Sequence, residues 1–347
     1  MMKSKLFAGI LILLLAACQK ETISMGTGES QTFYVDSKGA SMQVLVEGNL
    51  ISHVFLIFVH GGPGSSSLPY NTDYISSHLE KDYALVYLDQ RNAGASQGNF
   101  NGSDLNLTQM TTDLRNVILV IKKRYGDDSK IFLLGHSFGG LLTASYLTTY
   151  YIQGMVDGWL FVDGSQNYPL NDTLTREKLL YTGEEQIRLS KHVKEWQEIV
   201  TWCTDHPGNF TLDQSMQMET FAGAAETYLD EVTQIDPVAS NLGIALKEHW
   251  PLTSMLMNYL YSSNAAFIKD LYKTAFTSQL NRVKVPTLLL FGEYDFTCPL
   301  GLGDDIFNRI GTLDVSMEIS YKSGHEMMFQ DPEFFCREVA GFIELHR

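Results

Sequence analysis

Two patterns of hydrophobic residues alternate along the chain. Short, nearly continuous apolar runs are separated by longer segments in which apolar residues recur every three or four positions. Continuous runs are typical of strands that are buried on both faces of a sheet, and the longer pattern is typical of amphipathic helices. We therefore expect buried strands at 53–59, 84–88, 130–134, 157–162, 287–291 and 315–319.

The segments around these strands predict an α/β fold class. Polar residues 19–31 form a predicted tether, and 32–35 and 42–46 are expected to pair as a hairpin around a turn at 37–40. Helices are expected at 71–81, 107–125 and 332–345. Strands that alternate with helices imply right-handed crossovers and a mostly parallel, twisted sheet with helices on both faces.

The alternation of strands and helices stops after residue 164 and resumes at 282. Between 165 and 281 the apolar spacing is helical throughout, for example in 184–204 and 264–280. An α/β core made of 32–164 and 282–347 is therefore expected to carry an inserted all-helical cap. Open α/β sheets bind their ligands at the carboxyl ends of the strands. The cap is expected to cover that edge.

The first 18 residues are not expected to belong to the fold. A basic start is followed by an apolar stretch, 6–15, that is too short to span a bilayer, and then by Ala16, Ala17 and Cys18. This ending resembles the lipobox of bacterial lipoproteins, which implies cleavage before Cys18 and lipidation of that cysteine. The alternative is an ordinary secretory signal followed by an unrelated cysteine. The expected location is the bacterial cell envelope, in the periplasm or on the outer surface.

Which face of the envelope the protein occupies stays open. Residues 18–21 are partly similar to the surface-export signal of some Bacteroidetes lipoproteins. The net charge of −15 argues against nucleic acid as a partner and against electrostatic adhesion to anionic lipid. The only expected contact with the membrane is the lipid anchor, and the oligomeric state is not indicated.

Three cysteines follow Cys18 in the sequence, namely Cys203, Cys298 and Cys336. An odd number leaves at least one free or intermolecular thiol in an exported protein. Cys298 and Cys336 lie in segments that are expected to be neighbours, so a disulfide between them is left open. No cysteine belongs to a cluster with metal-ligand spacing, and no metal site is predicted.

The candidate nucleophile is Ser137. It lies in segment 135–140, GHSFGG, between the predicted strand 130–134 and an apolar helical segment, 141–147. A serine in such a strand-to-helix turn, with a glycine two residues to either side, forms a nucleophile elbow. Glycine is expected at both positions because the tight turn leaves no room for a side chain.

A serine hydroxyl needs a base, and the base needs an orienting carboxylate; in hydrolases with this elbow the chain order is Ser, acid, His. Asp295 follows strand 287–291 and is the predicted acid, with Glu293 as the alternative. His325 follows strand 315–319 and is the predicted base. The one later histidine is penultimate, and the earlier ones break the order; structural or wall positions are predicted for four of these, His53, His60, His136 and His249.

Two backbone amides should stabilise the oxyanion of the tetrahedral intermediate. The first is the amide of Phe138, directly after the nucleophile and at a helix start, where the helix dipole favours negative charge. The second should come from the glycine-rich loop 60–64, HGGPG, that follows strand 53–59. Gly62 is the predicted donor, and Gly61 is the alternative.

Together, segments 60–64, 89–91 and 135–139, with Asp295 and 324–325, resemble the proline iminopeptidase branch of the α/β-hydrolase superfamily. The resemblance runs from about residue 50 to the end, apart from the helical insertion. It implies a capped serine hydrolase that needs no metal or cofactor and often removes N-terminal residues from peptides. Asp89 and Arg91 are expected to brace the neighbouring loop.

Two departures from that family leave the substrate open. The family's elbow often reads GGSWG, and its cap has an ENHYF stretch with acidic residues for the substrate amine, which is absent here. Glu219, Glu226 and Glu231 lie in the cap and are available for that role, although solvated helix surface is the favoured interpretation of each. The sequence is compatible with an aminopeptidase for short peptides, an esterase for small acyl compounds, or a non-catalytic binding protein.

Overall fold

The computed structural model describes residues 25–99, 101–149, 153–232 and 264–347. Within these ranges nine strands form one sheet in the order β1-β2-β4-β3-β6-β7-β8-β9, with β5 beside β2. β1, β2, β4 and β5 pair antiparallel at one side, and the pairs from β4 to β9 are parallel. The strands are β1 (Glu29–Ser37), β2 (Ala40–Gly48), β3 (Val54–Val59), β4 (Ala84–Leu88), β5 (Gln97–Gly98), β6 (Lys130–His136), β7 (Gly158–Val162), β8 (Thr287–Gly292) and β9 (Val315–Ser320).

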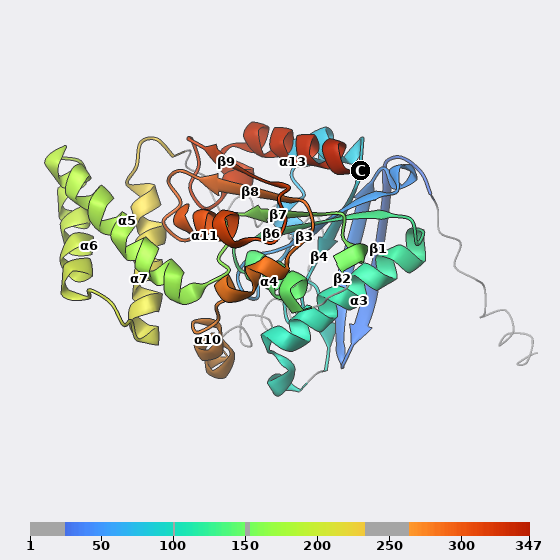
Figure 1. The fold of residues 1–347 in the computed structure, drawn as a ribbon, viewed down its shortest axis with the longest axis horizontal. Helices are drawn as coiled ribbons and strands as arrows, with labels where there is room; N and C mark the ends of the chain where they lie inside the picture. The colour runs from blue at the N-terminus through green and yellow to red at the C-terminus, as the bar shows by residue number, and fades with distance from the viewer. Residues whose placement is uncertain (1–24, 100, 150–152, 233–263) are drawn as a thin grey trace, which may run out of the picture.

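Helices cover both faces of this sheet. The α-helices are α2 (Asp73–Ile75), α3 (Leu107–Tyr125), α4 (Phe138–Thr149), α5 (Tyr168–Arg188), α6 (Val193–Asp205), α7 (Leu212–Thr227), α10 (Ala265–Leu271), α11 (Gly301–Arg309), α12 (Met327–Gln330) and α13 (Pro332–His346). Figure 1 shows α3 and α4 on one face and α13 on the other.

The continuous apolar runs are explained by the two layers of packing. Successive side chains of a strand point to opposite faces, so Phe55 and Ile57 of β3 pack in the layer with α3 and α4. Leu56 and Phe58 pack in the layer with α13. In β9, at the edge of the sheet, half-buried and exposed positions alternate instead, and only the last residue, Ser320, is buried.

Several predicted boundaries differ from the structure. β1 begins at Glu29, inside the predicted tether, because residues 29–31 pair with β2. The helix predicted at 71–81 is a short α2 followed by a π-helical turn, Ser76–Glu80. The continuous helix predicted at 184–204 is interrupted between α5 and α6, where Ser190 and His192 adopt positive φ angles of 59° and 43°.

The predicted helical insertion contains α5, α6, α7 and α10, which we call the cap. Segment 264–280 holds α10, an isolated bridge between Asn167 and Ala275, and part of a 3-10 helix, Thr277–Arg282. Residues 233–263 of the insertion, including His249, lie outside the described residues, as do residues 1–24 with the predicted lipidation site. No helix of the described residues is long and apolar enough to cross a bilayer.

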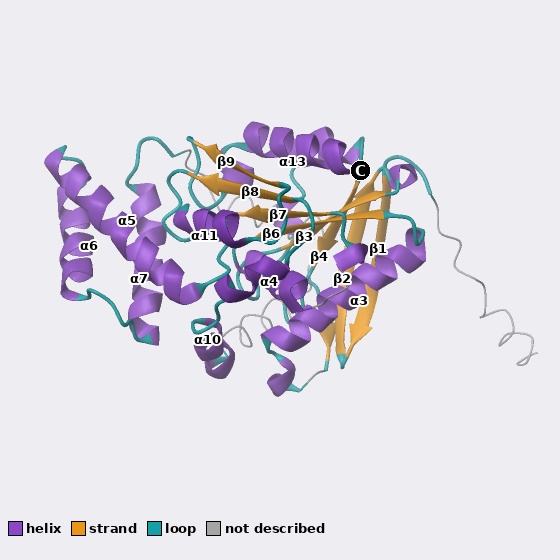
Figure 2. Ribbon diagram, in the orientation of Figure 1, coloured by secondary structure: helices purple, strands orange, loops and turns teal. Residues whose placement is uncertain are grey.

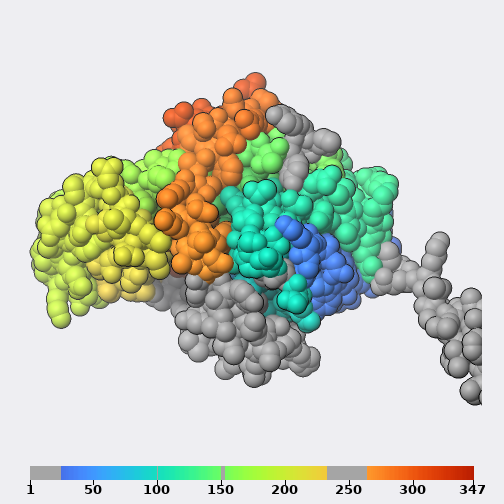
Figure 3. Space-filling model, turned by 90° about the horizontal axis from the view of Figure 1, so that it is seen from below, coloured from blue at the N-terminus to red at the C-terminus, as the bar shows by residue number. Residues whose placement is uncertain are grey.

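The cap lies at the carboxyl ends of the parallel strands. Figure 2 shows the arrowheads of β8 and β9 directed toward α5, α6 and α7, and Figure 3 shows these cap helices as a lobe at one end of the molecule. The cap has its own apolar cluster, in which Trp196 and Met218 pack with Phe296 of the core. This shared cluster joins the cap to the loop that follows β8.

The disulfide left open for Cys298 and Cys336 does not form. Both are free, buried thiols, as is Cys203. Cys298 packs in the layer with α3 and α4, and Cys336 packs in the layer with α13. The sheet separates the two thiols, which sequence spacing could not reveal.

Candidate active site

The turn between β6 and α4 holds Ser137 in a constrained backbone conformation. Its φ angle is 54°, in a region that non-glycine residues rarely adopt. A Cβ on Gly135 would lie 2.5 Å from the carbonyl oxygen of Gly139, and a Cβ on Gly139 would lie 1.9 Å from that of Val59. The two glycines therefore allow the sharp turn that presents the serine hydroxyl at the edge of the sheet.

Ser137, His325 and Asp295 form a continuous hydrogen-bonded chain. The Ser137 hydroxyl lies 3.0 Å from His325 Nε2, and His325 Nδ1 lies 3.0 Å from Asp295 Oδ2. The serine follows β6, the aspartate follows β8 and the histidine follows β9. Three loops far apart in the sequence thus bring the predicted residues together at one end of the sheet.

Asp295, and not Glu293, is the carboxylate that contacts the histidine. The side chain of Asp295 is fully buried, and its second oxygen, Oδ1, accepts the amide of Cys298 at 2.7 Å. Both oxygens therefore have donors, which fixes the orientation of the carboxylate. The bond to Cys298 also closes a turn in the loop between β8 and α11.

The surroundings of His325 favour its charged form. Burial alone would lower its pKa, but the negative charge and hydrogen bond of Asp295, with further carboxylates nearby, raise it above the ordinary histidine value. The imidazole is therefore a strong proton acceptor. In the neutral form its Nδ1–H donates to Asp295, which leaves Nε2 to accept from Ser137.

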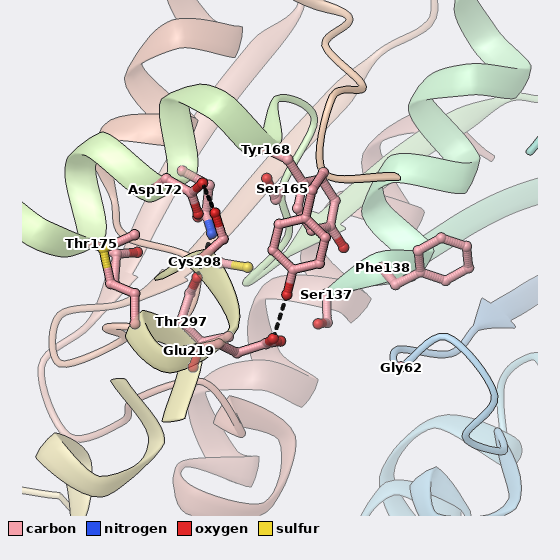
Figure 4. Close-up of a pocket in the computed structure, with 14 residues that line it drawn as sticks. Gly62, Ser137, Phe138, Ser165, Tyr168, Asp172, Thr175, Glu219, Thr297 and Cys298 are labelled. Carbon is pink, nitrogen blue, oxygen red and sulfur yellow. Dashed lines mark hydrogen bonds between the residues drawn. The ribbon is translucent and has the colours of Figure 1, made fainter. Parts of the chain in front are cut away.

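The predicted oxyanion donors line the same pocket as the serine. Gly62, Ser137 and Phe138 all border it, and Figure 4 shows them on its core side. Phe138 is the first residue of α4, so its amide has no acceptor within the helix. The alternative donor, Gly61, already directs its amide to the Tyr70 hydroxyl at 3.4 Å, which favours Gly62.

His136 is a structural residue that connects three loops. Its Nε2–H donates to the carbonyl of His325 at 2.8 Å, so Nδ1 accepts from the Tyr70 hydroxyl at 2.7 Å. Tyr70 in turn accepts the Gly61 amide. Burial lowers the pKa of His136 to about 3, which keeps this arrangement neutral.

Buried polar contacts also hold the predicted oxyanion loop and the loop after β4. Nε2 of His60 accepts the amide of Gln90 at 3.2 Å. Asp89 accepts from the Ser66 hydroxyl at 2.7 Å, and Arg91 forms a two-pronged ion pair with Asp113 at 2.6 and 3.0 Å. These contacts brace the loops and leave Asp89 and Arg91 away from the serine.

The pocket next to Ser137 contains two carboxylates from the cap. Glu219 of α7 accepts the Tyr272 hydroxyl at 2.6 Å, and Asp172 of α5 accepts that of Ser215 at 2.5 Å. Figure 4 shows both acids projecting from the cap side of the pocket that Ser137 borders. Burial raises the pKa of Asp172 to about 6. The sequence offered Glu219 as a candidate, whereas Asp172 had no distinguishing signal.

Two further acids surround the hydrogen-bonded chain, and the sequence reasoning missed the role of both. Glu226, expected on the solvated surface of the cap, is 9% exposed and accepts the backbone amide of His325. Asp163, at the end of β7, is fully buried and accepts the amide of Gly292 at 2.7 Å. Burial and the nearby charge of Asp295 raise the pKa values of both acids. Glu231, by contrast, is exposed.

One group of metal-ligating side chains is present among the described residues. Asp295, Cys298 and His325 place suitable atoms within 4.8 Å of one another. Both ring nitrogens of His325 are already engaged, by Asp295 and by Ser137. The geometry therefore favours a proton-transfer chain at this position over a metal site.

Comparisons with known proteins agree with the fold. Residues 54–332 match the model of the alpha/beta hydrolase fold family, and the chain belongs to that family. The "Probable aminopeptidase YbaC" of Bacillus subtilis is 22% identical over 322 residues, which cover 89% of this chain and 95% of that protein. The protein is accordingly a serine hydrolase.

Solved structures with the same fold include enzymes of two classes. The proline iminopeptidase of Mycobacterium smegmatis is similar with a TM-score of 0.64 and 17% identity, covering 92% of this chain and 98% of that one. An esterase from Exiguobacterium antarcticum is similar with a TM-score of 0.57 and 16% identity, covering 92% and 100%. At these identities the structures establish the fold alone.

Proposed function

We propose that this serine hydrolase is an aminopeptidase of the proline iminopeptidase type, which removes N-terminal residues from short peptides. Ser137 is the nucleophile, His325 the general base and Asp295 the carboxylate that orients it. The observation that carries the choice of substrate is the carboxylate of Glu219 in the pocket next to Ser137.

Acylation follows from the hydrogen-bonded chain. Ser137 Oγ attacks the carbonyl carbon of the first residue while its proton passes to His325 Nε2, 3.0 Å away. The oxyanion accepts hydrogen bonds from the amides of Gly62 and Phe138. His325 then gives its proton to the leaving nitrogen, the C–N bond breaks, and an acyl-serine ester remains.

Deacylation repeats these steps with water. His325 removes a proton from the water that attacks the acyl-serine ester, and the same two amides stabilise the second oxyanion. Transfer of the proton from His325 to Ser137 Oγ releases the free amino acid. Asp295 keeps Nδ1–H of His325 directed away from the serine in both halves of the reaction.

The acidic pocket supports an amine-containing substrate. An N-terminal ammonium group needs a negative partner when it leaves water, and Glu219 and Asp172 provide two carboxylates on the cap side. The Tyr272 hydroxyl donates to Glu219 and holds it in place. A peptide whose ammonium contacts Glu219 would place its first carbonyl toward Ser137. The resemblance to proline iminopeptidases and the relatedness to an aminopeptidase agree with this choice.

Glu219→Gln tests this substrate class. Hydrogen bonds to charged groups are worth about 1.5–3 kcal/mol, so kcat/KM for prolyl- or alanyl-naphthylamide should fall about 10- to 100-fold. Turnover of p-nitrophenyl acetate, which has no ammonium group, should change less than about 2-fold because this contact is not used. Glu231→Gln removes an exposed acid from the cap and is the matched control.

Assays of the wild-type enzyme on different substrates could contradict the aminopeptidase proposal. A wild-type enzyme that hydrolyses p-nitrophenyl esters and ignores every free aminoacyl amide is an esterase, and the aminopeptidase proposal is then wrong. Equal turnover of alanyl-naphthylamide and its N-acetylated form would also contradict the role of Glu219. If purified, folded protein shows no fluorophosphonate adduct on Ser137, the catalytic assignment itself fails.

We also propose that the protein is anchored in the bacterial cell envelope through a lipid on Cys18. The support is the sequence of residues 1–18, with its basic start, apolar stretch and small residues before the cysteine. With a lipid anchor, the enzyme would meet peptides at the membrane surface.

A further inference from the structure

Glu226 differs from the other cap acids in what it contacts. It belongs to α7, like Glu219, but it is absent from the lining of the pocket beside Ser137. Its carboxylate instead accepts the amide of His325, at 3.2 Å to each oxygen, and the amide of Phe296 at 3.4 Å. One cap side chain therefore bonds both the loop of the predicted base and the loop of the predicted acid.

The peptide groups on both sides of His325 are thereby held. Glu226 accepts its N–H from the cap side, and His136 donates to its C=O from the elbow side. A residue whose two backbone groups are both bonded has little freedom to rotate. The imidazole is therefore kept at the distance from Ser137 that proton transfer requires.

Gly324 shows that the local sequence accommodates this contact. A Cβ at this position would lie 2.2 Å from Oε2 of Glu226, closer than real Cβ contacts allow. Gly324 has no positive φ angle, so alanine is compatible with its backbone. A side chain at position 324 would therefore have to displace the Glu226 carboxylate.

We propose that Glu226 is a positioning residue for the hydrolytic reaction: by bonding the backbone of His325, the cap helix α7 holds the catalytic base in place. The proposal rests on the proposed role of His325 as general base. The cap then does more than select substrates, because detachment of α7 would release the backbone of the base. Glu219 determines which substrate binds, and Glu226 determines how well the bound substrate reacts.

Glu226→Ala is the first test. Loss of the acceptor should lower kcat for p-nitrophenyl acetate about 10- to 100-fold, since small displacements of a catalytic group cost rates of this order. KM should stay within about 2-fold because Glu226 does not line the pocket. Glu226→Gln keeps an acceptor oxygen of the same shape and should restore kcat to within about 3-fold of wild type. Glu231→Ala, an exposed acid, should leave both parameters unchanged.

Gly324→Ala disturbs the contact between Glu226 and His325 from the side of His325. It tests the positioning role of Glu226 even if Glu226→Ala does not fold. The new methyl should displace the Glu226 carboxylate and lower kcat to a similar extent. In the double variant, Glu226→Ala with Gly324→Ala, the methyl occupies the space that the glutamate side chain leaves. Adding Gly324→Ala to Glu226→Ala should therefore lower kcat further by less than about 2-fold. This non-additivity is the signature of a shared contact.

The controls separate this proposal from the assignment of the catalytic residues. Wild-type protein is first treated with a fluorophosphonate probe; if Ser137 is not labelled, the proposed function fails. If Ser137 is labelled and the variants react as fast as wild type with unchanged kcat, Glu226 has no positioning role. A rise in KM alone, or fully additive losses for the two substitutions, would equally overturn it.

Discussion

At the scale of single residues, His325 has more partners than the reaction itself requires. Its ring contacts Ser137 and Asp295, and its backbone contacts His136 and Glu226. In the proposed mechanism the ring contacts direct the proton, and the backbone contacts hold the ring in position. Substitution of His136 or Glu226, the partners of its backbone, should therefore change the rate of hydrolysis without changing the order of the proton transfers.

The raised pKa of His325 predicts an activity that increases with pH. Burial opposes the charged imidazole, but the carboxylate of Asp295 outweighs it. Only the neutral imidazole can take the serine proton, so kcat/KM should rise as pH passes through this pKa, at pH values above the ordinary 6.5. A profile measured on p-nitrophenyl acetate between pH 5 and 10 tests this, corrected for spontaneous hydrolysis.

The same shift has the opposite effect on stability. His325 binds its proton more tightly in the folded protein than in the unfolded chain. Its contribution to the free energy of unfolding is therefore complete below the pKa of the unfolded state and disappears as pH rises through the pKa of the folded state. Activity and this part of the stability should therefore change in opposite directions.

A rate that stays flat from pH 5 to 8 would contradict the role of His325 as base.

At the scale of elements, the elbow depends on the close approach of α4 and β3. A Cβ on Gly139 would meet the carbonyl oxygen of Val59 at 1.9 Å and that of His60 at 2.9 Å. Those residues lead into the loop of Gly62. The elbow and the predicted oxyanion loop are therefore in direct backbone contact, and a side chain at position 139 would push them apart.

Gly139→Ala should reduce both stability and activity. Overpacking costs about 1–3 kcal/mol, and the displaced loop should also lower the rate of Ser137 labelling. Gly223→Ala is the matched control, because its Cβ would meet nothing within 4 Å on the exposed side of α7. That control should gain about 0.5–1 kcal/mol from lower chain entropy. Urea unfolding measures both changes, and equal stabilities for the two variants would refute the packing argument.

The sequence predicts elements well where local pattern alone determines them. The central strands are continuous apolar runs, and helix 107–125 was predicted with the bounds of α3. The predicted triad residues follow strands whose carboxyl ends meet at one edge, so their proximity was foreseeable from topology. The break between α5 and α6 was not, since left-handed conformations at Ser190 and His192 leave no strong signal in those residue types.

Contacts between distant segments were the least predictable features. Glu226 and His325 lie 99 positions apart, and a glutamate on an amphipathic helix is usually solvated. The separation of Cys298 and Cys336 by the sheet likewise depends on which face each side chain takes. Such features follow from tertiary packing and are absent from the periodicity of either segment.

At the scale of the whole molecule, the cap is bonded to the loops of the predicted triad through several side chains. Asn171 and Thr175 of α5 each donate to a backbone carbonyl of the loop after β8, at 2.9 Å. Lys178 donates to the carbonyl of Glu293 in the same loop, and Glu226 of α7 adds its bonds from the other side. The described part of the cap is thus attached to the loops that hold Asp295 and His325.

The proposed lipid on Cys18 would hold this assembly at a membrane. The net charge of −15 disfavours adhesion to anionic lipid, so an acyl chain is the expected source of membrane affinity. Cys18→Ala should remove palmitate incorporation and move the protein from the detergent phase to the aqueous phase in Triton X-114 partitioning. The turnover of p-nitrophenyl acetate should be unchanged in protein purified without residues 1–24, since the catalytic groups lie far along the chain.

Gln19→Ala is the matched control for the anchor, because it changes the adjacent residue and keeps the thiol. It should incorporate palmitate like the wild-type protein and stay in the detergent phase. Acylation supplies about 0.8 kcal/mol of membrane affinity per buried methylene, and an acyl chain buries many methylenes. A change in a single neighbouring side chain could not offset that total. If Cys18→Ala still incorporates palmitate or still partitions into detergent, the lipid is attached elsewhere or the membrane contact has another origin, and the proposed anchor is wrong.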